Sequence, residues 1–173
     1  ITADNSTLLG FESGYSIVDG NNNTFLGQKA GKYTTSGDSN TFTGNLSGQN
    51  NQTGSNNSAV GGAASYLNTS GNNNVAMGSA ALYNNSTGTG NVAIGKSAGQ
   101  YMLGSRNTSI GAYSDMNSNT YTNATAIGYS ARVMGSNRIQ LGADGSTVNS
   151  EVTTPIENVR TSGTLTLGSV TYP

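Results

Sequence analysis

Two copies of one pattern decide the fold of this chain: Asn74-Val75-Ala76-Met77-Gly78 and, one repeat later, Asn91-Val92-Ala93-Ile94-Gly95. A large apolar residue followed by Gly recurs along the sequence, and one variant, Thr43-Gly44, keeps the same register. The repeated glycines are Gly10, Gly27, Gly44, Gly61, Gly78, Gly95, Gly111, Gly128 and Gly142. The numbers of successive glycines differ by 17, 17, 17, 17, 17, 16, 17 and 14. Fixed spacing of this kind is the signature of a repeat architecture, in which each repeat forms one structural unit.

The three residues before each glycine have the pattern of a short strand. A β-branched residue or Ser stands three positions before Gly, and a large apolar residue usually stands directly before it. The position between them holds Leu8, Phe25 and Phe42 in the first repeats and mainly Ala in the later ones. Such alternation predicts a strand with both faces at least partly buried. A second short strand is expected after each Gly, followed by a polar turn.

Two further columns of the repeat keep a constant character. Asn recurs four positions before Gly, at Asn23, Asn40, Asn57, Asn74, Asn91 and Asn107. We expect these amides to form ladders along the stacked coils, where they satisfy backbone groups of the turns. A small residue stands three positions after Gly until the last repeat and indicates close approach there. The next position is Gly in several repeats, for example Gly14 and Gly31, which suits a bend with positive φ.

The composition fits a stack of thin core slices rather than one wide core. Of the 173 residues, only 33% are hydrophobic and 9% are charged, while 25 are Gly and the net charge is -1. The chain has no Lys/Arg cluster, which excludes the electrostatic footprint of nucleic-acid or anionic-membrane binding. No apolar run approaches the roughly 20 residues of a membrane span, so we expect no membrane insertion.

Catalysis has few candidate residues, and we expect neither an enzyme nor a cofactor or metal site. His and Cys are absent, which removes Ser-His-Asp and Cys-His arrangements and thiolate metal ligands. Glycoside hydrolysis needs two carboxyl groups within roughly 5–10 Å of each other. Glu12 and Asp38 could approach on adjacent coils, but we expect solvated surface positions for both.

Coils of about 17 residues, stacked at the spacing of β-strands, predict an all-β parallel solenoid that rises about 4.8 Å per coil. If one strand column fills the coil, the opposite column needs cover from outside. Association of identical chains around a shared axis provides that cover. We assign the axis to the middle column of the strands: Leu8, Phe25, Phe42, Ala59, Ala76, Ala93 and Ala126.

Several segments resemble the head repeats of YadA-like trimeric autotransporter adhesins, which also occur in phage and phage-like tail fibres. They are Asn74-Val75-Ala76-Met77-Gly78-Ser79-Ala80-Ala81, Asn91-Val92-Ala93-Ile94-Gly95-Lys96-Ser97-Ala98 and Ala124-Thr125-Ala126-Ile127-Gly128-Tyr129-Ser130-Ala131. The resemblance covers residues 5–142. It implies a left-handed parallel β-roll assembled as a homotrimer, outside the cell, on a bacterial surface or on a phage-like fibre. Residues 1–142 are then the head repeats, and 143–173 a capping or neck-like strand segment. The period of this chain exceeds the family's usual repeat, so larger turns are expected here.

The resemblance also predicts adhesion, in which three copies on one rod bind a cell-surface glycan or protein receptor with raised avidity. The alternatives are a purely structural spacer of a fibre and, more distantly, an ice-binding solenoid. Possible ligand-facing residues are Tyr15, Tyr33, Tyr66, Tyr83 and Tyr101, five or six positions after their Gly. Exposed Tyr suits recognition, but large aromatic side chains more often pack, and packing is the interpretation that we favour. The threonines before Gly share a face with the apolar column, so we expect buried packing rather than ice binding.

Overall fold

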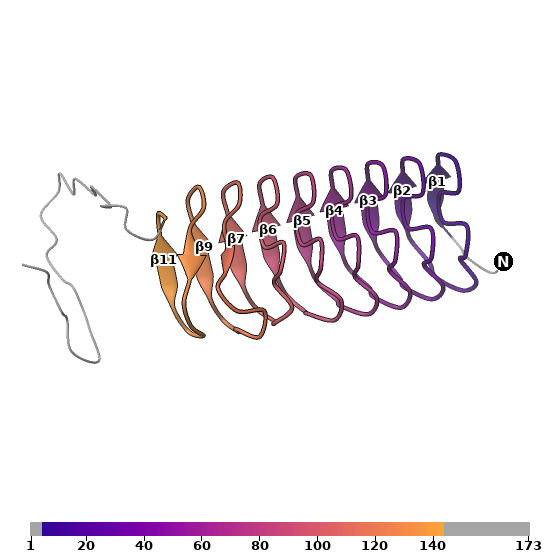
Figure 1. Ribbon diagram of the computed structural model, residues 1–173. Coiled ribbons are helices and arrows are strands. Elements are labelled where there is room, and N and C mark those ends of the chain that lie inside the picture. Colours follow the sequence, from indigo (N-terminus) through magenta and orange to yellow (C-terminus); the bar gives the residue numbers. More distant parts are fainter. Residues whose placement is uncertain (1–4, 144–173) are drawn as a thin grey trace, which may run out of the picture.

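The computed structural model describes residues 5–143, which wind into a stack of coils along one axis (Figure 1). Each coil contributes one strand to a parallel sheet of nine strands. These strands are β1 (Thr7–Leu9), β2 (Thr24–Leu26), β3 (Thr41–Thr43), β4 (Ser58–Val60), β5 (Val75–Met77), β6 (Val92–Ile94), β7 (Thr108–Ile110), β9 (Thr125–Ile127) and β11 (Ile139–Leu141). No helix occurs within the described range. The predicted all-β solenoid with about 17 residues per coil is therefore confirmed.

The register of the sheet places equivalent residues of successive coils side by side. Between β5 and β6, Val75 pairs with Val92, Ala76 with Ala93 and Met77 with Ile94. The second strand expected after each Gly forms in two coils only, as β8 (Asp115–Met116) and β10 (Arg132–Val133), which pair with each other. In the other coils of the described part, the same position is a turn, and the prediction is wrong there. The predicted segment 143–173 lies outside the described residues, apart from Ala143.

The interior of each coil is narrow and is filled by the middle column of the strands. The rings of Phe25 and Phe42 stack inside the rod, with centroids 4.9 Å apart and planes 9° from parallel. The residues opposite these rings are Gly31 and Gly48. A side chain at either position would collide with the ring across the coil. Both glycines also have the predicted positive φ, of 56°. Where the strand residue is Ala, as at Ala76, the bend instead carries a buried Leu82. Large and small residues thus compensate across these coils, which preserves close packing.

The assignment of the middle column to a trimer axis is wrong for this reason. Within the single chain the exposure of Phe25, Phe42, Ala59, Ala76, Ala93 and Ala126 is 1% or less. Leu8 belongs to the same inward column, although it is partly exposed in the first described coil. Alternation had shown which residues share a face, but not which of the two faces lies inside the coil. The outer face therefore carries the larger apolar column and the threonine column, which is half-buried to exposed rather than packed in the core.

A ladder of buried asparagines runs along the rod, as the sequence predicts. The backbone N–H of Asn74 donates to the side-chain oxygen of Asn57 at 3.0 Å, and that of Asn91 donates to Asn74 at 2.9 Å. The side-chain amide of Asn74 also donates to the Gly88 carbonyl of the next coil at 2.8 Å. A second buried column, Asn51, Asn68 and Asn85, escaped the sequence analysis because only three coils carry it. Each of these amides donates to the glycine carbonyl three residues later, and Asn68 also donates to the side-chain oxygen of Asn51 at 2.7 Å. In the first column, each amide thus links its own coil to the next one.

The repeated glycine after each strand is required by both its backbone angle and its surroundings. At Gly27 the φ angle is +136°, a conformation that other residues rarely adopt. A Cβ atom placed there would lie 2.6 Å from the carbonyl oxygen of Gly44 in the next coil. Coils therefore approach each other at this corner more closely than any side chain permits.

We expect the substitution Asn74→Ala to destabilise the rod markedly. It leaves the buried Asn91 N–H without its partner, at a cost of about 1–3 kcal/mol. It also removes one of the two side-chain amides that donate to the Gly88 carbonyl, whose other donor is Asn85. Urea unfolding followed by circular dichroism measures this loss. Asn84→Ala is the matched control, because the Asn84 side chain makes no hydrogen bond to another described residue. Equal midpoints for the two variants would contradict the role of the ladder.

Candidate binding surfaces

The outer face of the sheet is uncharged and combines an apolar column with a column that is mainly Thr and Ser. Two columns of each strand point outward, one directly before the repeated Gly and one two positions earlier. The first column is Leu9, Leu26, Thr43, Val60, Met77, Ile94, Ile110, Ile127 and Leu141. Met77, near the middle of the rod, is 45% exposed. Neither column contains a charged residue in the described coils. We call this surface the sheet face. Exposed apolar side chains gathered on one face are typical of an interaction site.

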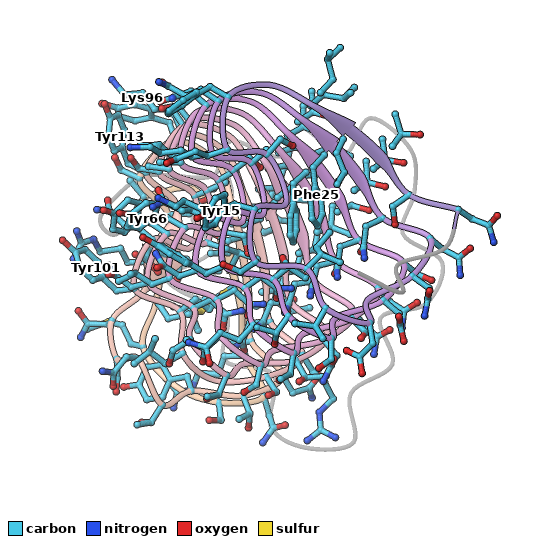
Figure 2. All side chains as sticks on the ribbon, turned by 90° about the vertical axis from the view of Figure 1, so that its right-hand side faces the viewer. Tyr15, Phe25, Tyr66, Lys96, Tyr101 and Tyr113 are labelled. Carbon is cyan, nitrogen blue, oxygen red and sulfur yellow. The ribbon has the colours of Figure 1, made fainter. Side chains whose placement is uncertain are left out.

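Tyrosines gather on another side of the rod. Figure 2 shows Tyr15, Tyr66, Tyr101 and Tyr113 on one side, with Phe25 in the interior. The predicted tyrosines differ in exposure: Tyr15 (72%), Tyr101 (59%) and Tyr33 are exposed, whereas Tyr66 and Tyr83 are half-buried. Tyr66 and Tyr83 stack on each other with centroids 4.9 Å apart. The favoured packing interpretation therefore holds for this pair and is wrong for the three exposed rings. We call this surface, with Tyr113, the tyrosine side.

Two lysines accompany the rings of the tyrosine side. Lys32 lies 5.9 Å from the ring centroid of Tyr15 and 5.1 Å from that of Tyr33, and Lys96 lies 5.6 Å from that of Tyr113. Cation–π contacts of this length orient exposed rings with modest energy. The sequence analysis missed Lys32, Lys96 and Tyr113. Lys32 and Tyr113 stand at repeat positions where the other coils have different residues, so the repeat pattern did not identify them.

Glu12 and Asp38, the two carboxylates considered above as a catalytic pair, each bind a different group. The Glu12 carboxylate forms an ion pair with Lys32 at 2.8 Å, and this hydrogen bond raises the pKa of the Lys32 ammonium. The Asp38 carboxylate accepts the backbone N–H of Asn21 at 2.7 Å. Within residues 5–143, no three His, Cys, Asp or Glu side chains lie close enough together to hold a metal ion. No helix of that range is long and apolar enough to cross a membrane.

A groove with a volume of about 410 Å³ lies on the outside of the coils that follow β4, β5, β6 and β7. It is lined by Leu67, Asn84, Ser86, Tyr101, Leu103 and Asn119. Small-molecule sites typically occupy roughly 300–1,000 Å³. Of the predicted ligand-facing residues, only Tyr101 lines it. The sequence analysis missed the other five.

A buried carboxylate, that of Asp115, supports the backbone beside this groove. It accepts the N–H of Tyr101 at 3.1 Å and the N–H of Met116 at 2.8 Å. Burial raises the pKa of Asp115, and these two N–H donors and the charge of Arg132 oppose that rise. The carboxylate occupies the bend position that is Gly, Ser or Leu in the preceding coils.

The fold defines a parallel β-solenoid, and these surfaces are its candidate binding sites. The chain matches no protein-family model, no curated protein and no solved structure. The resemblance to adhesin head repeats therefore depends on the quoted motifs.

We expect the stability of the chain to depend on pH through Asp115. Because its folded pKa lies above the ordinary value of 3.8, the stability it contributes is fully present below 3.8 and is lost as pH rises through the folded pKa. The difference in unfolding free energy between the native chain and Asp115→Asn should therefore shift in favour of the native chain as pH falls from about 7 to about 4. Urea titrations at a series of pH values measure it. A flat difference, or one of opposite slope, would contradict the assignment.

Proposed function

We propose that this chain is a homotrimeric segment of an extracellular fibre that binds a cell-surface receptor through its tyrosine side. The observation that carries the proposal is the sheet face, an uncharged surface with an exposed apolar column that only Thr43 interrupts. The likeness of its repeats to YadA-like adhesin heads and to phage-like tail fibres supports a trimer of left-handed β-rolls. It also supports a location on a bacterial surface or on a phage-like fibre.

Copies of the same chain are the occupant that suits the sheet face best. Its columns keep one register along the rod, so a second rod with the same repeat meets apolar side chains in every coil except that of β3, whose two outward residues are Thr41 and Thr43. The absence of charge in these columns means that close approach desolvates no ion. Burial of Val60, Met77 and Ile94 would remove apolar area from water, which is the main favourable term in association. The shared axis thus passes beside the column before Gly instead of the middle column.

Trimer formation would leave the tyrosine side free for a ligand. Tyr15, Tyr33 and Tyr101 present broad rings that lose little conformational entropy on binding. Three copies on one rigid rod raise avidity without a strong single contact. The alternative functions become outcomes of the tests: a trimer that binds no receptor is a spacer. A monomer leaves the flat sheet face and its threonines open, as an ice-binding solenoid requires.

We expect the native chain to have a solution mass three times that of the 17.5 kDa protomer. Met77→Lys should convert it to a monomer, because it places an ammonium group in the middle of the apolar interface. Light scattering measures both masses. Ser79→Lys is the matched control, since Ser79 is exposed and the equivalent residue of the next coil is already Lys96. A native monomer, or a trimer unaffected by Met77→Lys, would contradict this interface.

If the trimer acts by multivalent display, Met77→Lys should weaken adhesion without touching the ligand surface. Binding of the native chain and of the variant is compared on receptor-bearing cells immobilised in a flow cell. We expect apparent affinity to fall by roughly 10²-fold or more, as for loss of avidity. Equal apparent affinities of trimer and monomer would favour a single strong contact over avidity.

A further inference from the structure

One coil of the rod is a residue shorter than its neighbours, and the difference falls at one place. The residue numbers of Gly95 and Gly111 differ by 16, whereas each preceding pair of repeated glycines differs by 17. In the preceding coil, Ser86 is followed by Thr87 and then by Gly88. In the short coil Leu103, the equivalent of Ser86, is followed at once by Gly104. The missing residue is therefore the equivalent of Thr87.

This deletion interrupts a series of backbone hydrogen bonds between coils. In the regular coils, two successive N–H groups donate to one carbonyl of the next coil. Those of Gln52 and Thr53 bind the Thr69 carbonyl at 2.9 and 3.0 Å, and those of Thr69 and Ser70 bind the Ser86 carbonyl at 2.8 and 3.2 Å. The next pair is Ser86 and Thr87. Neither of these N–H groups donates to another described residue.

The groove lies at this interruption, and its wall combines apolar surface with unpaired polar groups. Leu67, Tyr101 and Leu103 supply the apolar part. The side chains of Asn84, Ser86 and Asn119 supply donors and acceptors, and none of them forms a hydrogen bond to another described residue. None of the six lining residues is charged. Asp115 fixes the backbone of Tyr101 from inside the coil, so the ring stands on a supported segment.

We propose that this groove binds a neutral hexose unit of an oligosaccharide. The Tyr101 ring, which is 59% exposed, would contact the C–H face of the sugar, whose hydrogens meet the negative face of the ring. The amides of Asn84 and Asn119 and the hydroxyl and free N–H of Ser86 would bind the sugar hydroxyls. The proposal deepens the proposed function, on which it rests, by naming the class of receptor.

The chemistry of the wall favours a neutral sugar over the other ligands of a cell surface. An anionic sugar would find no cation among the lining residues, and a basic peptide would find no anion. A purely apolar ligand would leave the polar groups of the wall desolvated and unpaired, which is costly. A hexose has one apolar face and a rim of hydroxyl groups, and it therefore satisfies both halves of the groove.

The test uses the full chain and an array of neutral hexose and N-acetylhexosamine oligosaccharides, beside sialylated and sulfated counterparts. The strongest neutral binder is then titrated in solution by calorimetry. We expect binding to be confined to the neutral set, and Tyr101→Ala and Asn84→Ala each to weaken it at least tenfold. Tyr129→Ala, an exposed tyrosine outside the groove, should leave affinity within twofold. Insertion of one Thr after Leu103 restores the regular step of the repeat and should abolish binding.

The outcomes separate this site from the proposed function. Absence of neutral binding, preference for charged glycans, or full affinity in Tyr101→Ala overturns the groove, even if the chain is a trimer that adheres through another surface. A monomeric chain that binds neutral sugar and loses it on Tyr101→Ala retains the groove and removes the fibre assembly. If the insertion variant fails to fold by circular dichroism, the two alanine variants decide.

Discussion

The whole rod depends on coils that stack with each residue above its own equivalent. A polar side chain inside such a stack lies next to the equivalent side chains of the neighbouring coils and must be able to form hydrogen bonds beside them. Asn meets this requirement because its amide donates and accepts at once, so that Asn57, Asn74 and Asn91 continue one ladder. A column of carboxylates would repel itself, and a column of hydroxyls would reach less far. The glycine corner follows from the same constraint, because Gly27 passes the next coil at a distance that excludes a Cβ atom.

The sequence predicted the features that register imposes on every coil. The strands before Gly, the Asn ladder and the positive φ of Gly31 and Gly48 were all confirmed. Which strand face lies inside could not be obtained from alternation. The column with Val60 and Met77 is larger and more apolar than the alanine column, yet it lies outside, and bend residues such as Leu82 fill the space beside the alanines. Only the structure of the complete coil shows which face lies inside.

The candidate surfaces were predicted in part. Spacing placed the tyrosines on one flank, but the exposure of each depends on what occupies the same column one coil away. Tyr66 meets Tyr83 and is half-buried, whereas Tyr101 meets no ring and stays open. The shortened step after Gly95 was visible in the sequence. Its structural consequence, the unpaired N–H groups of Ser86 and Thr87, could be seen only in the hydrogen bonds between neighbouring coils.

Because each coil contacts chiefly the coils beside it, the cross-section is independent of the number of coils. Duplication or loss of one whole repeat would lengthen or shorten the rod by about 4.8 Å and leave its lateral surfaces in line. The length of the rod could thus change during evolution in equal steps, without any change in the packing of the coils. The loss of a single residue has a different effect, as the coil after Gly95 illustrates. It leaves the number of coils unchanged and makes one coil differ from the others.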